Sequence, residues 1–315
     1  MVQPPTDPSN LPAELITIRD WFRYAVTQFE RAGLVYGHGT TSAVDEAAFL
    51  VLETLRLPIN DINPWLDARL VRQERAALAQ IIEARVVTRK PASYLTKTAY
   101  LGPYKFHVDE RVIVPRSFIA ELILADGLAS VVPEPESVSS VLELCTGSAS
   151  IAIVAAHAFA DAHVDATELS ADALNVAQLN IKAHGLSDRI SAHLGDLYGA
   201  LPPKPYDLII TNPPYVTDAA VGAFPPEYRA EPKMAHAGGK DGLDLVHRIL
   251  KAAPDYLAPE GVLVCEIGQA RPAFEAAYPG LEVLWLATDE SEDEVFAVTR
   301  EALTGRRKSP KKARK

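Results

Sequence analysis

Ser140–Phe159 reads SVLELCTGSASIAIVAAHAF, and this stretch decides the fold class of the chain. The apolar, strand-like run Ser140–Leu144 is followed by five small residues and then by an apolar segment of helix length, Ser150–Phe159. A small-residue loop between a strand and a helix lets the backbone approach a ligand beside the helix N-terminus. The loop has one glycine and lacks the Gly-x-Gly-x-x-Gly spacing of dinucleotide-binding proteins, so a plain tight turn would also explain it.

Strand-like runs and helix-length segments alternate from this stretch to the end of the chain. The further runs are His163–Glu168, Ile190–Leu194, Tyr206–Thr211, Gly261–Ile267, Leu281–Leu286 and Val295–Thr299, and the helical segments between them include Ala171–His184 and Asp244–Tyr256. Such alternation predicts a parallel α/β sheet with helices on both faces. The final two runs leave no room for a helix between them, so we expect the last strand to run antiparallel.

A helical region precedes the sheet. Apolar residues at three- and four-residue steps in Leu15–Phe29, with Phe22 in the stripe, predict a first helix, and Phe49–Leu55 and Leu78–Val86 predict two more. Short runs rich in Tyr, Phe and Val around Gly102-Pro103 predict a β-hairpin. We therefore expect a helical domain over residues 1–90, a hairpin linker over 91–115, an α/β domain over 116–302 that opens with a helix around Ile119–Leu128, and a basic disordered tail over 303–315.

Length and composition are those of a globular protein. The 315 residues are 48% hydrophobic and 23% charged, which excludes a disordered chain, a collagen-like fibre and a small disulfide-stapled scaffold. No apolar run approaches the ~18 residues that span a membrane, and the N-terminus lacks a signal-peptide pattern, so we expect a cytoplasmic protein without membrane contact. Cys145 and Cys265 lie in apolar segments and are expected to be buried thiols. The histidines show no ligand-like spacing with them, which argues against a metal site.

Charge is distributed unevenly along the chain. The last eleven residues, GRRKSPKKARK, hold seven basic residues and no acid; without them 24 basic residues face 41 acidic ones, a net charge of −17. A body this acidic binds nucleic-acid phosphates poorly and attracts a basic protein. The tail allows a weak RNA contact, although a solvated, disordered end is the simpler interpretation.

Two carboxylates follow the neighbouring strands. Glu168 ends the second run, 21 residues after Gly147, and Asp196 follows the third run. Nucleotide-binding sheets place an acid at the first position, where its two oxygens accept both hydroxyls of a ribose, and Asp196 could reach an adenine amino group. Either acid alone could be a helix cap. Because the carboxyl ends of parallel strands meet at one edge of a sheet, the two acids and the Gly147 loop together predict a nucleoside-binding site.

The fourth run ends in the most specific motif of the chain, Asn212-Pro-Pro-Tyr215. Two consecutive prolines fix the backbone and remove two N–H donors, which leaves carbonyl groups free to face a ligand. We expect a planar NH₂ group to bind there, with one N–H donating to the Asn212 side chain, the other to the Pro213 carbonyl, and its plane against Tyr215. A rigid loop without a ligand is the alternative interpretation.

Such a pocket fits N-methylation. An amide or exocyclic-amine nitrogen is a weak nucleophile because its lone pair is delocalised, and acceptors for its N–H groups draw off the positive charge that develops as the new bond forms. S-adenosyl-L-methionine carries an activated methyl group on a sulfonium, so the reaction needs neither a metal nor a covalent intermediate. Alignment of nitrogen, methyl and sulfur can recover ~7–11 kcal/mol of the barrier. We therefore predict a methyltransferase that uses S-adenosyl-L-methionine.

At these residues the chain resembles the HemK/PrmC–PrmB family of protein-(glutamine-N5) methyltransferases, whose hallmark is the Asn-Pro-Pro-Tyr of residues 212–215. The resemblance covers nearly the whole chain. It implies a Rossmann-like, seven-stranded class I methyltransferase sheet with a helical N-terminal domain and a β-hairpin linker. It is strongest to the branch that methylates a glutamine of large-subunit ribosomal protein L3. The stretches that carry it are Tyr36-Gly-His-Gly-Thr40, Asp45-Glu-Ala47, Val114-Pro-Arg-Ser117, Cys145-Thr-Gly-Ser148 and Glu227-Tyr-Arg-Ala-Glu-Pro232.

The resemblance also implies roles for individual residues. The cofactor would be held along its methionine part by Glu143, Cys145, Thr146, Gly147, Ser148 and Ala149, at its ribose by Glu168, and at its adenine by Asp196 and Leu197, with Asn212 also in contact; the glutamine amide would be seated by Asn212, Pro213, Pro214 and Tyr215. Ala149 stands where relatives usually have glycine, so we expect either a negative φ there or a shifted loop with weaker cofactor binding. Glu168 replaces the commoner aspartate and is one methylene longer.

Three other functions stay open at this point. Methylation of a peptide chain release factor would use the same chemistry, although that branch typically shows Pro-Arg-Pro-Glu-Thr where this chain reads Pro115-Arg-Ser-Phe-Ile119. N-methylation of an exocyclic base amine in nucleic acid would present the same planar group, but the acidic body opposes it. A non-catalytic ribosome-assembly factor would explain Ala149 by a loss of cofactor binding. His38 lies in a glycine turn and is expected to be a surface residue unless it contacts the substrate.

Overall fold

The computed structural model describes residues 15–288 and 291–305, and the chain divides into two compact units. The helical unit holds the residues up to Ala99 together with Val108–Glu110 and Phe224–Glu231. The sheet unit holds Tyr100–His107, Arg111–Ala223 and the residues from Pro232 onward. This division differs from the unbroken α/β domain expected over residues 116–302, because Phe224–Glu231 belongs with the helices.

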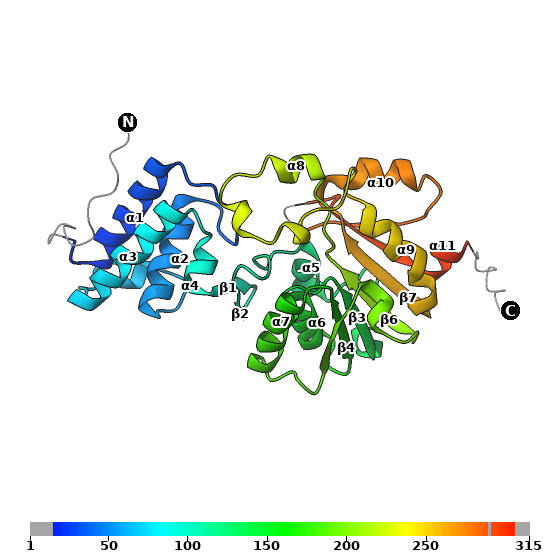
Figure 1. The fold of residues 1–315 in the computed structure, drawn as a ribbon. Coiled ribbons are helices and arrows are strands. Elements are labelled where there is room, and N and C mark those ends of the chain that lie inside the picture. The colour runs from blue at the N-terminus through cyan, green and yellow to red at the C-terminus, as the bar shows by residue number, and fades with distance from the viewer. Residues whose placement is uncertain (1–14, 289–290, 306–315) are drawn as a thin grey trace. The chain divides into compact units, whose positions relative to one another are not determined.

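The helical unit is built from three long helices around one apolar core (Figure 1). They are α1 (Ile18–Ala32), α2 (Ala43–Leu55) and α3 (Arg72–Thr88), followed by the short α4 (Ala92–Thr96), which the sequence pattern did not predict.

A capping box between Thr17 and Asp20 starts α1, and Gly33 ends it with a left-handed φ of 57°. The buried stripe of α1 includes Trp21, whereas Phe22, expected in that stripe, is only partly buried.

The sheet unit contains the expected seven-stranded sheet. Its strands are β3 (Ser140–Leu144), β4 (His163–Glu168), β5 (Ile190–Leu194), β6 (Tyr206–Thr211), β7 (Leu257–Glu266), β8 (Leu284–Leu286) and β9 (Val295–Thr299). They lie side by side in the order β5-β4-β3-β6-β7-β9-β8. β3 to β7 pair in parallel, whereas β9 pairs antiparallel with both of its neighbours, which confirms the direction predicted for the last strand.

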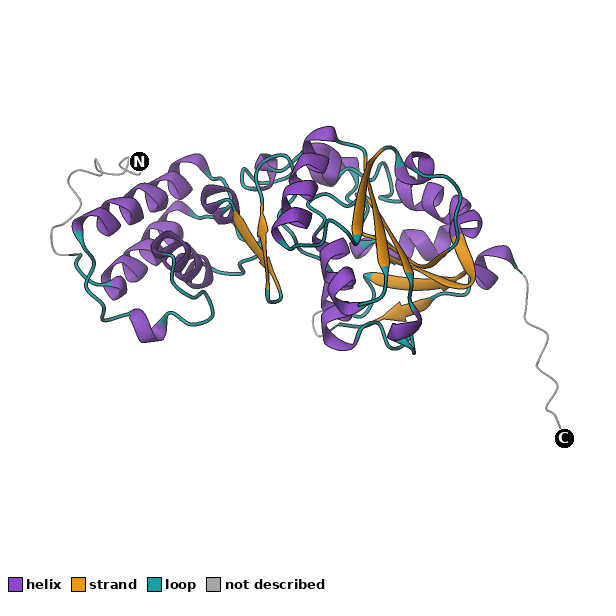
Figure 2. Ribbon diagram, turned by 90° about the horizontal axis from the view of Figure 1, so that it is seen from below, coloured by secondary structure: helices purple, strands orange, loops and turns teal. Residues whose placement is uncertain are grey.

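Helices cover both faces of this sheet, as Figure 2 shows. They are α5 (Phe118–Asp126), α6 (Ser150–Ala158), α7 (Ala171–Ala183), α9 (Asp244–Tyr256), α10 (Arg271–Ala277) and α11 (Arg300–Thr304). The short α8 (Asp218–Gly222) buries none of its residues. α6 packs beside both α5 and α7, and α9 packs beside α11. The central strands are therefore buried on both sides, and Val141, Leu142 and Leu144 of β3 have no exposed surface.

The predicted hairpin is present as a two-stranded sheet of β1 (Thr98–Leu101) and β2 (Tyr104–His107). At the other end, α11 extends to Thr304 and so enters the tail expected over residues 303–315. Residues 306–315, which carry most of that tail, lie outside the described residues.

Both cysteines are free thiols, with Cys265 fully buried and Cys145 partly buried. Across residues 15–288 and 291–305, no helix is both long enough and apolar enough to cross a membrane. The same ranges contain no group of three or more His, Cys, Asp or Glu side chains placed to hold a metal ion.

Candidate functional site

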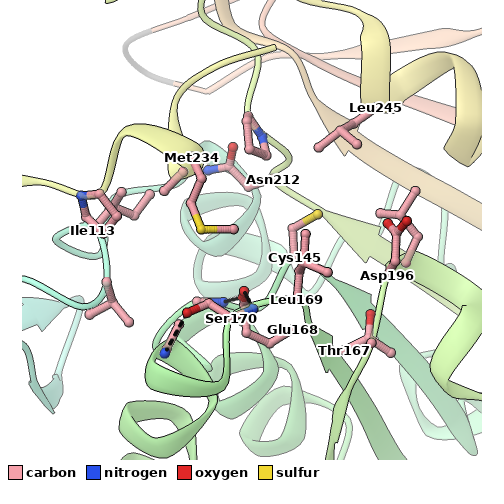
Figure 3. A pocket seen from close by; sticks show the side chains of 18 of the residues that line it. Ile113, Cys145, Thr167, Glu168, Leu169, Ser170, Asp196, Asn212, Met234 and Leu245 are labelled. Atoms are coloured by element: carbon pink, nitrogen blue, oxygen red, sulfur yellow. Dashed lines mark hydrogen bonds between the residues drawn. The ribbon is translucent and has the colours of Figure 1, made fainter.

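A cavity opens in the sheet unit at the carboxyl ends of its central strands (Figure 3). The strand order places β3 between β4 and β6, and open α/β sheets bind ligands at such a reversal of strand order. The space between the lining atoms amounts to about 910 Å³, part of it open to solvent. The residues expected at the site that line it are Cys145, Gly147, Glu168, Asp196, Leu197, Asn212 and Pro214.

The other expected site residues do not line this cavity, and they are Glu143, Thr146, Ser148, Ala149, Pro213 and Tyr215. Glu143 is buried beneath the loop, where its Oε2 accepts hydrogen bonds from the Thr146 hydroxyl and from the Ala152 N–H at 3.1 Å. Burial raises the pKa of the Glu143 carboxyl to about 8. Glu143 therefore ties the β3–α6 loop to the first turn of α6.

The backbone of that loop is left-handed at three positions: Cys145 (φ 59°), Gly147 (φ 55°) and Ala149 (φ 62°). Ala149 was expected either to keep a negative φ or to shift the loop. The expectation of a negative φ was wrong. The φ of Ala149 is positive, so an alanine takes the backbone conformation that glycine adopts without strain. Ala149 is fully buried at the start of α6, and its carbonyl accepts from the Ile153 N–H at 3.0 Å.

Glu168 ends β4, and its carboxylate is held by two backbone groups. Oε2 accepts from the Gly147 N–H at 2.9 Å, and Oε1 accepts from the Ser170 N–H at 2.8 Å (Figure 3). A carboxylate oxygen has two lone pairs, so each oxygen keeps one acceptor position. The two oxygens of the Glu168 carboxylate therefore offer a ligand two fixed, neighbouring acceptors, which suits a pair of neighbouring hydroxyl groups.

Asp196 lies on the far side of the cavity from Met234 (Figure 3), and Leu197 also lines the cavity. Asp196 is half-exposed, and its Oδ2 accepts from a guanidinium nitrogen of Arg248 at 2.6 Å. Arg248 comes from α9, lines the same cavity, and was not predicted. Leu197 is buried with a φ of 51° and gives this end of the cavity an apolar wall.

Asn212 directly follows β6, and its side-chain amide is oriented by two acceptors. Nδ2 donates to Oε1 of Glu266 at 2.9 Å and to the Arg116 carbonyl at 3.4 Å. Oδ1 of Asn212 accepts no hydrogen bond from any of the described residues. Because Asn212 lines the cavity, this amide brings an uncommitted acceptor to the site.

Tyr215 stands beside the cavity, in contact with Gly268. Its hydroxyl donates to Oε1 of Glu266 at 3.4 Å, and burial with the nearby Glu266 charge raises its pKa. A Cβ atom on Gly268 would lie 2.4 Å from a ring carbon of Tyr215, and one on Gly242 would lie 2.2 Å from the Tyr215 carbonyl. These glycines let the chain pack closely around the ring, a requirement that the sequence analysis missed.

Glu266, the last residue of β7, is a site residue that the sequence analysis also missed. It is 2% exposed, and its Oε2 accepts from the Ser117 hydroxyl at 2.7 Å. The pairing of Thr211 with Cys265 brings the next residues of both strands, Asn212 and Glu266, together. An acidic residue inside the apolar run Gly261–Ile267 was a visible signal, but only the β6–β7 register links it to Asn212.

His38 belongs to the helical unit and does not line this cavity, and the prediction of a surface histidine was wrong. It is 2% exposed, its Nε2 lies 3.4 Å from a carboxylate oxygen of Glu231, and its ring lies 4.2 Å from that of Tyr228. Tyr36–Thr40 thus packs against Phe224–Glu231, although the two segments are far apart in sequence.

A buried ion cluster in the same unit holds Phe224–Glu231. Arg85 is fully buried, donates to Glu46 at 2.6 Å, and lies 4.0 Å from Glu227. Glu227 also accepts from the Val35 N–H at 3.0 Å and pairs with Arg89 at 2.7 Å. These contacts explain why a segment expected in the α/β domain belongs with the helices.

Part of the chain matches a known family model. Residues 125–224 match the model of the methyltransferase small domain. A methyltransferase structure from Pyrococcus furiosus has a TM-score of 0.46 and 16% identity over 70% of this chain and 96% of that chain, a likeness too low to bear on activity.

Curated relatives are far more similar. The ribosomal protein uL3 glutamine methyltransferase of Bordetella pertussis is 52% identical over 92% of this chain and 97% of its own length. The proteins of the same name from Burkholderia pseudomallei and Bradyrhizobium diazoefficiens are 51% and 50% identical, over 91% and 90% of this chain and 95% and 90% of their own lengths. With about half of its residues identical over nearly the full length of these relatives, the chain belongs to the ribosomal protein uL3 glutamine methyltransferase family.

Proposed function

We propose that this protein transfers a methyl group from S-adenosyl-L-methionine to the side-chain amide nitrogen of a glutamine in ribosomal protein L3 (uL3). The observation that carries the proposal is the Asn212 amide that lines the cavity, with its nitrogen donating to Glu266 and its oxygen accepting from none of the described residues. The family relationship supports both the reaction and the substrate.

The residues of the cavity fit the proposed cofactor. The two acceptor positions left on Glu168 suit the ribose hydroxyls, and the apolar wall of Leu197 suits the adenine, with the remaining oxygen of Asp196 in reach of its amino group. The β3–α6 loop, which supplies Cys145 and Gly147, would hold the methionine part. When bound, the cofactor supplies a methyl group activated by a sulfonium.

The chain itself then prepares the glutamine nitrogen. One amide N–H donates to Oδ1 of Asn212 and the other to the Pro213 carbonyl, so both acceptors stabilise the positive charge that develops on nitrogen until one N–H proton is lost to solvent. The prolines hold the backbone in place and donate no competing hydrogen bond. Met234 lies beside Asn212 in the cavity (Figure 3), and with Ile113, which also lines the cavity, it offers an apolar approach for the glutamine methylenes.

Both the net charge of the chain and its family membership support uL3 as the partner. Residues 1–304 carry a net charge of −17, which favours a basic, RNA-binding ribosomal protein over a bare nucleic acid. The corresponding compartment is the cytoplasm, where ribosomal proteins are made. A weak RNA contact would fall to the basic residues 306–315 alone.

The function is tested by competition among substrates. The protein is incubated with methyl-labelled cofactor and equal amounts of uL3, a release factor and an RNA fragment, and the label on each is counted. We expect label on uL3 alone, at a glutamine. Label on the release factor in place of uL3 would overturn the substrate, and label on RNA would overturn the reaction class.

A further inference from the structure

The carboxylate of Glu266 lies directly behind the amide that faces the substrate. Its two oxygens have different neighbours. Oε2 accepts from two donors near the start of α5, the Ser117 hydroxyl at 2.7 Å and the Ile119 N–H at 3.5 Å. Oε1 faces the site, where it accepts from Asn212 Nδ2 at 2.9 Å and from the Tyr215 hydroxyl at 3.4 Å.

This arrangement allows one orientation of the Asn212 amide. Both groups near Nδ2, the Glu266 carboxylate and the Arg116 carbonyl, can only accept hydrogen bonds. A rotation of the amide by half a turn would place Oδ1 against two acceptors and present the NH₂ group to the cavity. The substrate amide would then meet a donor where it needs an acceptor.

We propose that Glu266 is a positioning residue that, as a carboxylate, holds the Asn212 amide with its oxygen toward the substrate nitrogen. This inference rests on the proposed function, because it assigns the state of Asn212 needed for methyl transfer. Glu266 itself touches neither the substrate nor the cofactor cavity.

Protonation of Glu266 is expected to undo this orientation. Burial and the neighbouring Glu294 raise the pKa of Glu266 to about 7, although Ser117 and the N–H groups of Phe118 and Ile119 act against the rise. Each oxygen receives two donors, but the Ile119 N–H on Oε2 is a fixed backbone donor, whereas the Asn212 amide and the Tyr215 hydroxyl on Oε1 can turn to accept, so the added proton belongs on Oε1. Oε1 then donates, and the amide is released or turned.

Glu266→Gln tests the proposal because glutamine has the same shape and no charge. The glutamine oxygen takes the place of Oε2, beside the Ser117 and Ile119 donors, and its NH₂ group turns the Asn212 amide. In single-turnover assays on uL3 we expect a rate ~100-fold below wild type at pH 8, the scale of losing one preorganised polar group. The affinity for S-adenosylhomocysteine, measured by calorimetry, stays within about twofold of wild type, because Glu266 lies outside the cavity.

The pH profile separates positioning from a purely structural role. The wild-type rate rises about tenfold per pH unit and levels off above about pH 7, whereas the Glu266→Gln rate is flat over the same range. The control is Glu294→Gln, which removes the carboxylate that raises the Glu266 pKa. It keeps the wild-type plateau rate and shifts the midpoint to lower pH.

A second readout needs no substrate. In protein labelled with ¹⁵N at asparagine, the side-chain amide signals of Asn212 are assigned by their loss in Asn212→Ala and followed from about pH 5.5 to pH 9. They should titrate near pH 7 in the wild type and stay constant in Glu266→Gln. A wild-type rate in Glu266→Gln, or Asn212 signals that do not titrate, would overturn the inference. If uL3 is not methylated at any pH, the proposed function fails and the amide titration still decides the role of Glu266.

Discussion

Three residues around the cavity, Cys145, Ala149 and Leu197, hold a left-handed backbone without being glycine. Each such residue costs on the order of 1–3 kcal/mol, and strain of this kind collects where a structure is shaped around a ligand. The strained loop at Cys145–Ala149 also carries the Gly147 N–H that fixes Glu168. The strained backbone and the N–H group that fixes Glu168, the proposed ribose acceptor, are therefore parts of one turn.

Ala149→Gly measures this strain at a single residue. Glycine relieves ~1–2 kcal/mol of left-handed strain. It also loses a buried methyl group and gives the unfolded chain more conformational entropy, and both changes destabilise the folded state. We therefore expect little net change in the stability of α6. The matched control is Ala152→Gly, a fully buried alanine inside the same helix, which should lose ~1–2 kcal/mol. Hydrogen exchange of α6 peptides reports both changes. Equal losses in the two variants would show that Ala149 is unstrained.

At the scale of elements, the ion cluster around Arg85 joins α2 and α3 to Phe224–Glu231. This segment leads directly into Pro232 and Met234, which line the cavity. Removing one partner of a buried ion pair costs ~3–5 kcal/mol, because it leaves the other charge unpaired. The cluster is thus strong enough to keep the segment folded onto the helical unit.

Glu227→Gln tests the cluster. Loss of the charge that pairs with Arg89 should release Phe224–Glu231, so we expect tryptic cleavage after Arg229 to become about tenfold faster or more. Glu275→Gln, which breaks the exposed Arg271–Glu275 pair, serves as the control and should leave the cleavage rate unchanged. Similar rates in all three proteins would mean that the cluster does not hold the segment.

The elements also show why the sequence predicted some of the site and not the rest. Glu168, Asp196 and Asn212 each lie at or just after the end of a strand-like run, so their place at one edge of the sheet could be predicted from strand ends alone. Glu266 joins them only through the β6–β7 register, which no local pattern encodes. His38 was misjudged because its partners, Tyr228 and Glu231, lie almost 200 residues away in the chain.

At the scale of the whole molecule, we expect net charge to affect the binding of uL3, measured by KM, and not the methyl-transfer step, measured by kcat. The acidic body attracts a basic partner over distances at which salt screens the interaction. Raising the ionic strength from about 0.05 to 0.5 M should raise KM for uL3 several-fold and leave kcat within about twofold. Truncation after Gly305 provides the control, because the remaining chain keeps its net charge of −17 and should show the same salt dependence. A KM that does not change with salt would show that charge plays no part in uL3 recognition.

The most direct measurement is tandem mass spectrometry of uL3 after incubation with S-adenosyl-L-methionine and either the wild type, Asn212→Ala, or the control Asn175→Ala, an exposed asparagine of α7. We predict one methyl group on the side-chain nitrogen of a uL3 glutamine with the wild type and the control. With Asn212→Ala, the rate of its appearance should fall ~100-fold or more, because a preorganised acceptor is lost. An unmodified uL3, a methyl group on any other atom, or a wild-type rate with Asn212→Ala would contradict the claim that this amide prepares a glutamine nitrogen for methylation.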